Sequence, residues 1–124
     1  MKRIETLEKL REERKYYKEA GINATFGDAY FYSKDAGNEL INFGGTIWER
    51  DIDEILECCK KYEITEFTIS STFSGLVKII AEFTKRGCKL DGLVEINSYF
   101  VDIFTNEKER IPAFKMIAPR KEND

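Results

Sequence analysis

The sequence contains no histidine, and this absence removes the commonest routes to catalysis and metal binding. Histidine is the side chain that most often acts as a general base near neutral pH, and imidazole is the commonest metal ligand. The acidic residues also show no pair at a recognisable metal-binding spacing. We therefore expect neither a metal nor another cofactor, and the sequence gives enzyme activity little support.

Cysteine is scarce as well. The three cysteines, Cys58, Cys59 and Cys88, are odd in number and have no CxxC spacing, which indicates reduced thiols in a cytoplasmic protein. Free cysteines are usually small buried hydrophobic residues. Because Cys58 and Cys59 are adjacent on a predicted helix, at most one of them is expected to face the core.

Long apolar runs and a large excess of one charge are absent too. No stretch is apolar over the length that a membrane span needs, and no secretory leader is present, so no membrane contact is expected. The net charge of −3 is too small for a mimic of DNA. No concentrated basic face is available for nucleic-acid phosphates, so direct nucleic-acid binding is not expected either.

The sequence does contain a strand–helix–strand unit over residues 64–97. Phe67 and Ile69 alternate with polar residues, as in a strand at 66–71. Apolar residues then recur at helical spacing over 73–86, and Gly87 is placed to end that helix with a positive φ. A second strand at 92–98 completes a parallel crossover unit. The predicted core consists of Phe67, Ile69, Leu76, Ile80, Phe83, Ile55 and Leu56.

The remaining segments extend this unit to a single small α/β domain over residues 21–118. A strand at 39–43 precedes a helix at 48–62, for which Thr46 and Glu49 have capping-box spacing. The last strand, at 112–118, begins at Pro112, which is typical of a sheet edge. The predicted order is β-α-β-α-β-β with a mostly parallel sheet, in which the last strand lies antiparallel beside the third. The predicted buried face of the helix at 48–62 is Trp48, Ile52, Ile55, Leu56, Cys59 and Tyr62.

Residues 22–38 leave two alternatives open. Asp28 would cap a short helix that ends at Gly37, or the aromatic residues between them would form an irregular edge strand. The charged tail at 119–124 is expected to be disordered.

An N-terminal amphipathic helix over residues 1–20 precedes the domain. Its apolar face is narrow, and the other positions are densely charged. Such a face contributes little to a core, so this is either a solvated helix docked on the body or an interface for a protein partner or a second copy. Tyrosine and arginine are favoured anchors in protein interfaces. The candidate partner-binding residues are Arg3, Leu7, Arg11, Arg14, Tyr16 and Tyr17.

Two loops that follow predicted strands form a candidate ligand site. Helix N-termini at the carboxyl ends of parallel strands attract anions, and glycines there allow close backbone approach. No GxxxxGK[ST] or GxGxxG motif is present, however. The alternative is that the glycines make turns and the hydroxyls cap helices. The candidate residues are Gly44, Gly45, Thr46, Ser70, Ser71, Thr72 and Asn97.

The segments NELINF, IWERDI, EFTISSTFSGL, EFTKRGCKLDGLVEIN and RIPAFKM resemble those of a family of small α/β proteins from phages and other mobile elements of anaerobic gut bacteria. The resemblance covers roughly residues 38–118, and the family has no assigned activity. It implies an accessory protein that binds host or element proteins, for example an inhibitor of a host defence nuclease. We therefore predict a non-enzymatic protein-binding or regulatory protein. The alternative is a binder of small anionic ligands, or a minor enzyme, that uses the two loops.

Overall fold

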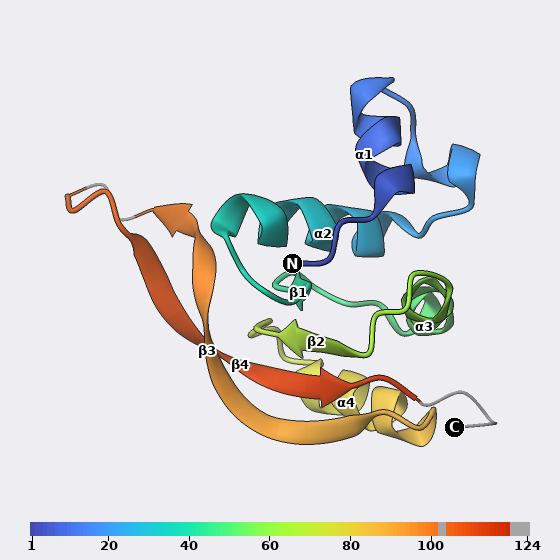
Figure 1. Cartoon of the computed structure of the whole chain (residues 1–124). Helices are drawn as coiled ribbons and strands as arrows, with labels where there is room; N and C mark the ends of the chain where they lie inside the picture. The colour runs from blue at the N-terminus through green and yellow to red at the C-terminus, as the bar shows by residue number, and fades with distance from the viewer. Residues whose placement is uncertain (102–103, 120–124) are drawn as a thin grey trace.

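The computed structural model describes residues 1–101 and 104–119, and within them it holds four α-helices, two short 3-10 helices and a four-stranded sheet (Figure 1). The predicted disorder of residues 119–124 falls, apart from Pro119, outside this part of the chain. No helix in the described residues is long and apolar enough to cross a bilayer.

The sheet has the order β1-β2-β4-β3. Its strands are β1 (Asn42–Phe43), β2 (Glu66–Ile69), β3 (Lys89–Val101) and β4 (Lys108–Ile117). β1 and β2 are parallel, whereas β4 pairs antiparallel with both β2 and β3. The parallel pairing of the first two strands was predicted correctly, but the mostly parallel sheet was wrong. The third strand does not lie beside the second, because the final strand is inserted between them.

Residues 22–38, for which helix and strand were both open, contain helix α2 (Ala24–Ala36). Asn23, and not Asp28, caps this helix by accepting a hydrogen bond from the backbone N–H of Phe26 at 3.1 Å. Gly37 ends it in the left-handed conformation with φ 76°. The helix therefore runs the full length between two standard capping residues.

Helix α2 also closes the sheet. The carbonyls of Ile41 and Phe43 accept hydrogen bonds from β2, so the backbone groups of Asn42 point to the outer edge of β1. There the Ser33 hydroxyl of α2 accepts from the Asn42 N–H at 2.7 Å. The hairpin of β3 and β4 curves upward until its far end reaches the C-terminal end of α2 (Figure 1). One helix thus covers the outer edge of β1, where it blocks pairing with another strand, and also contacts the opposite edge strand, β3, near Asn97.

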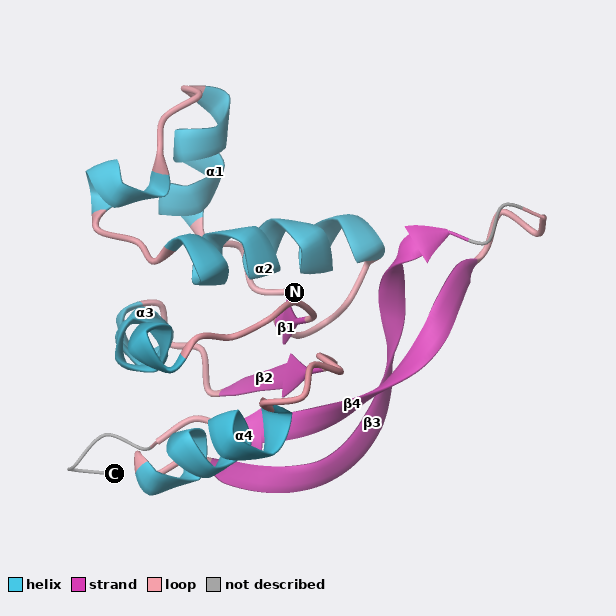
Figure 2. Ribbon diagram, turned by 180° about the vertical axis from the view of Figure 1, so that it is seen from behind, coloured by secondary structure: helices cyan, strands magenta, loops and turns pink. Residues whose placement is uncertain are grey.

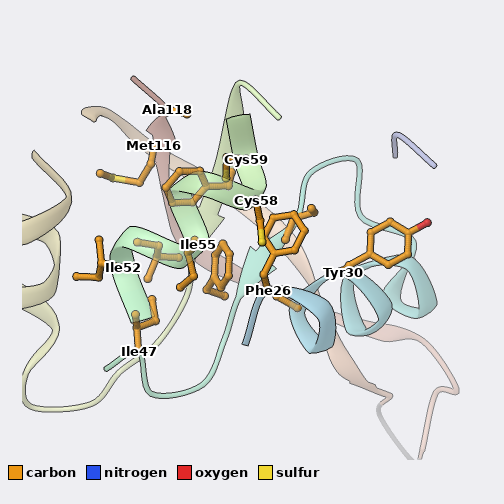
Figure 3. Close-up of a cluster of buried hydrophobic side chains, with 14 of the residues drawn as sticks. Phe26, Tyr30, Ile47, Ile52, Ile55, Cys58, Cys59, Met116 and Ala118 are labelled. Carbon is orange, nitrogen blue, oxygen red and sulfur yellow. The ribbon is translucent and has the colours of Figure 1, made fainter. Parts of the chain in front are cut away.

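Helices α3 (Ile52–Lys61) and α4 (Leu76–Lys85) supply much of the core. The Phe67 ring of β2 lies between Phe43, at a centroid distance of 5.6 Å, and Phe83 of α4, at 5.4 Å. Figure 3 shows Ile52, Ile55, Cys58, Cys59 and Met116 gathered with Phe26 of α2 in one apolar cluster. The sequence-based core is confirmed at Phe67, Ile69, Phe83 and Ile55, all of which are buried.

Other buried positions were predicted wrongly. In α4 the buried residues are Ile79 and Phe83, whereas Ile80 and Leu76 are only partly buried. Leu56 is likewise partly buried, and Trp48 is 56% exposed because the α-helix begins only at Ile52. Both adjacent cysteines are buried, because Cys58 packs towards α2 and Cys59 towards the sheet side of the same cluster.

The predicted caps of these two helices are also wrong. Helix α4 starts after Gly75, so Ser70, Ser71 and Thr72 precede its first turn by several residues. Glu49 belongs to a short 3-10 helix, η2 (Glu49–Asp51), and neither helix has a side-chain cap among the described residues. Gly87 does adopt the predicted positive φ, at 97°.

The N-terminal segment is two short helices and not one long helix. Helix α1 (Glu5–Glu12) ends before Arg14, which has φ 56°, and a 3-10 helix, η1 (Tyr17–Ala20), follows. Both lie over α2 at the end of the molecule farthest from α4 (Figure 2). Ile4, Leu7 and Leu10 are buried in the main cluster, so the narrow apolar face contributes more to the core than predicted.

Candidate protein-binding cleft

A buried polar network attaches α1 to α2. Glu8 is only 8% exposed, and its carboxylate accepts hydrogen bonds from the Tyr30 hydroxyl at 2.8 Å and from the Lys34 ammonium. The Tyr30 oxygen in turn accepts from the backbone N–H of Ile4 at 3.1 Å. The hydrogen bond from Lys34 is the main cause that holds the pKa of Glu8 below its ordinary value. This network fixes the position of α1 and hence of the turn that follows it.

The turn after α1 places Arg14 and Tyr17 beside α2. The Lys15 N–H donates to the Leu10 carbonyl at 2.9 Å, which closes the end of the helix around Arg14. Tyr17 then lies flat on α2 above Gly27, where a Cβ atom would come within 2.6 Å of its ring. The Tyr17 hydroxyl donates to Asp28 at 3.0 Å, and burial, followed by this hydrogen bond, raises the pKa of Tyr17 to about 12.

Between this turn, α2 and β3 lies an open cleft of about 410 Å³. Two aromatic contacts form its walls. The Arg11 guanidinium stacks 4.7 Å from the centre of the Phe31 ring, and Tyr32 of α2 meets Tyr99 of β3 edge to face at 4.9 Å. About half of the surface of Tyr32 and Tyr99 is exposed. The lining combines basic Arg11, Arg14 and Lys15, aromatic Tyr17, Phe31, Tyr32 and Tyr99, acidic Asp28 and Asp35, and Leu10.

The cleft brings together three of the six predicted partner-binding residues, Arg11, Arg14 and Tyr17. Tyr16 is 74% exposed but does not line the cleft. Arg3 pairs with Glu5 at 2.7 Å and lines a smaller, separate cleft of about 220 Å³. Leu7 is fully buried in the core, so its assignment to an exposed interface was wrong.

Sequence reasoning missed the other half of the cleft, which consists of Phe31, Tyr32 and Tyr99. The available signal was the aromatic run Tyr30-Phe31-Tyr32. On a helix, Tyr30 turns inward and is 1% exposed, while Tyr32 turns outward. That division cannot be made while the segment is undecided between helix and strand.

The two predicted ligand-binding loops do lie side by side, but their central side chains bond within the protein. Ser70 accepts a hydrogen bond from the Asn42 amide at 2.9 Å. The Ser71 hydroxyl donates to the carbonyls of Phe43, at 3.3 Å, and of Gly45. These contacts hold the chain between the ends of β1 and β2. The remaining loop residues, Gly44, Gly45, Thr46 and Thr72, are exposed.

Asn97 makes its hydrogen bonds elsewhere. Its amide donates to the Ala36 carbonyl at 3.1 Å, and its side-chain oxygen accepts from Arg110 at 2.8 Å. Its backbone N–H and carbonyl bond to the Asn38 side chain at 2.8 and 2.9 Å. Asn97 therefore joins the hairpin to the C-terminal end of α2.

Among the described residues, no group of three His, Cys, Asp or Glu side chains is arranged to hold a metal ion. Burial raises the pKa of Cys59 to about 12 and that of Cys88 to about 11. Thiols with such pKa values are almost entirely protonated at neutral pH and are weak nucleophiles.

The fold is thus a mixed α/β domain, in which a four-stranded sheet is closed by one helix and bears an aromatic, basic cleft at that helix. The chain belongs to the family defined by the domain of unknown function DUF7698, whose profile matches residues 25–118. The match begins within α2, earlier than the resemblance at 38–118 indicated, and leaves α1 and η1 outside. No curated protein and no solved structure showed a match to the chain.

Proposed function

We propose that this protein is a non-enzymatic binding or regulatory protein that recognises a protein partner through the cleft between α1, α2 and β3. The observation that carries this proposal is the exposed pair Tyr32–Tyr99 beside Arg11 and Arg14. Tyrosine and arginine dominate the binding energy of protein interfaces, because each offers a large contact area together with hydrogen-bonding groups.

The charge of the cleft supports a protein partner over a nucleic acid. Its three basic residues are accompanied by Asp28 and Asp35. A surface that follows a phosphate backbone needs several unopposed cations, and the chain as a whole carries a charge of −3. The resemblance to accessory proteins of mobile elements extends the proposal: the partner would be a host or element protein, such as a host defence nuclease.

Site-specific photo-cross-linking tests the proposal. A photoreactive phenylalanine analogue in place of Tyr32 should cross-link one protein partner in a host lysate. The same analogue in place of Val77, which is 82% exposed on α4 far from the cleft, is the control. We expect the cross-link from position 32 alone, and we expect Arg14→Ala to weaken it. Equal products from both positions, or none from position 32, would contradict the proposal.

The alternative of a small anionic ligand at the loops after β1 and β2 stays a prediction. The internal hydrogen bonds of Ser70 and Ser71 give it less support than the cleft gives to a protein partner. A thermal-shift screen with nucleotides and phosphorylated metabolites checks it, since a ligand at 100 times its Kd stabilises the fold by about 2.7 kcal/mol.

A further inference from the structure

We infer, on the basis of the proposed function, that the partner presents an acidic segment to the cleft and that an aspartate or glutamate of this segment pairs with Arg14. The charges inside the cleft point to this chemistry. The Arg11 guanidinium stacks on Phe31 and lies 3.9 Å from Asp35. The ammonium of Lys15 pairs with Glu13 at 3.0 Å, and Asp28 accepts the Tyr17 hydroxyl.

Arg14 is the basic residue of the cleft that these contacts do not pair. Its guanidinium makes no ion pair and no hydrogen bond within the described part of the chain, and its residue is exposed at the rim of the cleft. A guanidinium offers five donors in a planar fork that matches a carboxylate with two parallel hydrogen bonds. An acidic side chain is therefore the group that completes the cleft.

The backbone at Arg14 is a second, independent observation. Arg14 has φ 56°, a left-handed conformation that favours glycine, and glycine does occupy the corresponding positions at Gly21, Gly37 and Gly87. Two other non-glycine residues have a positive φ, Glu63 and Asn106. Asparagine tolerates this conformation, and the Glu63 carboxylate pairs with Lys2 at 3.4 Å. Arg14 gains no such contact within the described residues. A strained arginine without an internal partner indicates that the side chain is used outside the fold.

The aromatic residues of the cleft indicate which side chains should lie near the carboxylate in the partner's segment. Tyr17, Tyr32 and Tyr99 line the same cleft as Arg14 and present ring surface next to it. Such surface binds large apolar or aromatic side chains through burial and edge-to-face contacts. The expected ligand is a short segment in which Asp or Glu lies near a bulky apolar residue.

A peptide-display selection on the full chain tests this inference, with a random library whose peptides end in a neutral amide. Retained peptides should share an Asp or Glu close to an aromatic or large aliphatic residue. Arg14→Gly should weaken their binding about tenfold or more, as for an interface arginine. The melting temperature should stay the same or rise, because glycine relieves the left-handed strain. Lys18→Ala removes one exposed positive charge that does not line the cleft and should leave binding unchanged.

The outcomes separate this inference from the proposed function. Peptides that need Tyr32 but carry no acidic residue, or that bind Arg14→Gly equally well, overturn the acidic partner and leave protein recognition standing. No retained peptide, or retention that survives both Tyr32→Ala and Arg14→Gly, overturns both. Binding of a fluorescent single-stranded oligonucleotide that depends on Arg14 and Tyr32 would also overturn both, because the cleft would then be a nucleic-acid site.

Discussion

Glu8 shows how one buried carboxylate joins two helices. A buried charge is costly unless it is paired and hydrogen-bonded, and Glu8 has both the Tyr30 hydroxyl and the Lys34 ammonium as donors. Removing the charge would leave these two donors with a weaker acceptor. The residue is thus important for stability although it belongs to a helix that the sequence describes as mostly charged.

We expect Glu8→Gln, which keeps an oxygen acceptor but removes the negative charge, to lower the free energy of unfolding by about 1–3 kcal/mol at pH 7, because hydrogen bonds to a buried charge are stronger than those to a neutral amide. The pKa of Glu8 is lowered in the folded protein. Its contribution is therefore present above the unfolded-state pKa and is lost as the pH falls through the folded-state pKa. Urea unfolding of both proteins between pH 7 and pH 2 should show the difference shrinking in acid. A difference independent of pH would contradict this account.

Ile79 and Ile80 report the orientation of α4 about its own axis. Ile79 is 5% exposed whereas its neighbour Ile80 is only partly buried. Ile79→Ala should cost about 2–5 kcal/mol, and Ile80→Ala should cost clearly less, because a partly exposed site leaves a smaller cavity. Chemical denaturation of the two variants measures this. A larger loss for Ile80→Ala would mean that the helix is rotated relative to the structure.

The sequence could not resolve this orientation, because apolar residues occur at six of eight positions from Leu76 to Phe83. Several helical faces are then almost equally apolar. Packing in the core decides between them, because Ile79 and Phe83 are buried in the main cluster. The ion pairs of Arg86 with Asp53 at 2.6 Å and of Lys78 with Glu49 at 3.4 Å also link α4 to the segment of α3. Such contacts between distant segments are not visible in a local pattern.

At the scale of elements, α1 is a structural part of the domain as well as one wall of the cleft. The sequence predicted that this segment contributes little to the core, because its apolar face is narrow. In the structure three of the four predicted apolar side chains of this face, Ile4, Leu7 and Leu10, are buried, and the fourth, Tyr17, is partly buried. A short helix with few apolar residues can still bury all of them.

Deleting residues 1–13 should therefore destabilise the domain and not merely remove a binding surface. Each of the three side chains contributes about 1.5–3 kcal/mol when fully buried. Thermal unfolding followed by circular dichroism should show a clearly lower Tm for the truncated chain, and Arg14→Gly in the full chain serves as a control that changes the cleft alone. An unchanged Tm would show that the rest of the domain is stable without this segment.

The segment that became α2 illustrates a different limit. Its buried positions include Gly27 and Ser33, which weaken the apolar periodicity from which a helix is predicted. Ser33 is there because it hydrogen-bonds the edge of β1, and Gly27 because Tyr17 needs the space above it. Both residues serve contacts between elements, so the sequence pattern alone left helix and strand equally open. Because the segment was not assigned to a helix, the aromatic residues of the cleft were not predicted.

At the scale of the whole molecule, the elements were largely predictable but their arrangement was not. The main strands and helices lie near their predicted positions, because alternation and helical spacing are local signals. The insertion of β4 between β2 and β3 depends on pairings such as Phe67 with Met116, almost fifty positions apart in the chain. The length of the β3–β4 hairpin also allows it to reach α2, which no local pattern indicates.

The cleft depends on the contact between the β3–β4 hairpin and α2. Tyr32 comes from α2 and Tyr99 from β3, and Asn38 holds these two elements together by bonding both backbone groups of Asn97. Asn38→Ala leaves these two groups without their partners, while the helix and the hairpin each keep their own hydrogen bonds.

We expect hydrogen exchange measured by NMR to accelerate at the Asn97 amide in Asn38→Ala, with little change in the amides of α3. Peptide binding in the cleft should weaken as well, because two of the hydrogen bonds that hold Tyr99 near Tyr32 are lost, although the bonds from Asn97 to Ala36 and from Lys108 to Asp35 remain. Glu39→Ala changes an exposed neighbouring side chain and should affect neither quantity. If exchange at Asn97 accelerates but binding is unchanged, the Tyr32–Tyr99 pair does not form the recognition surface, and the cleft is defined by α1 and α2 alone.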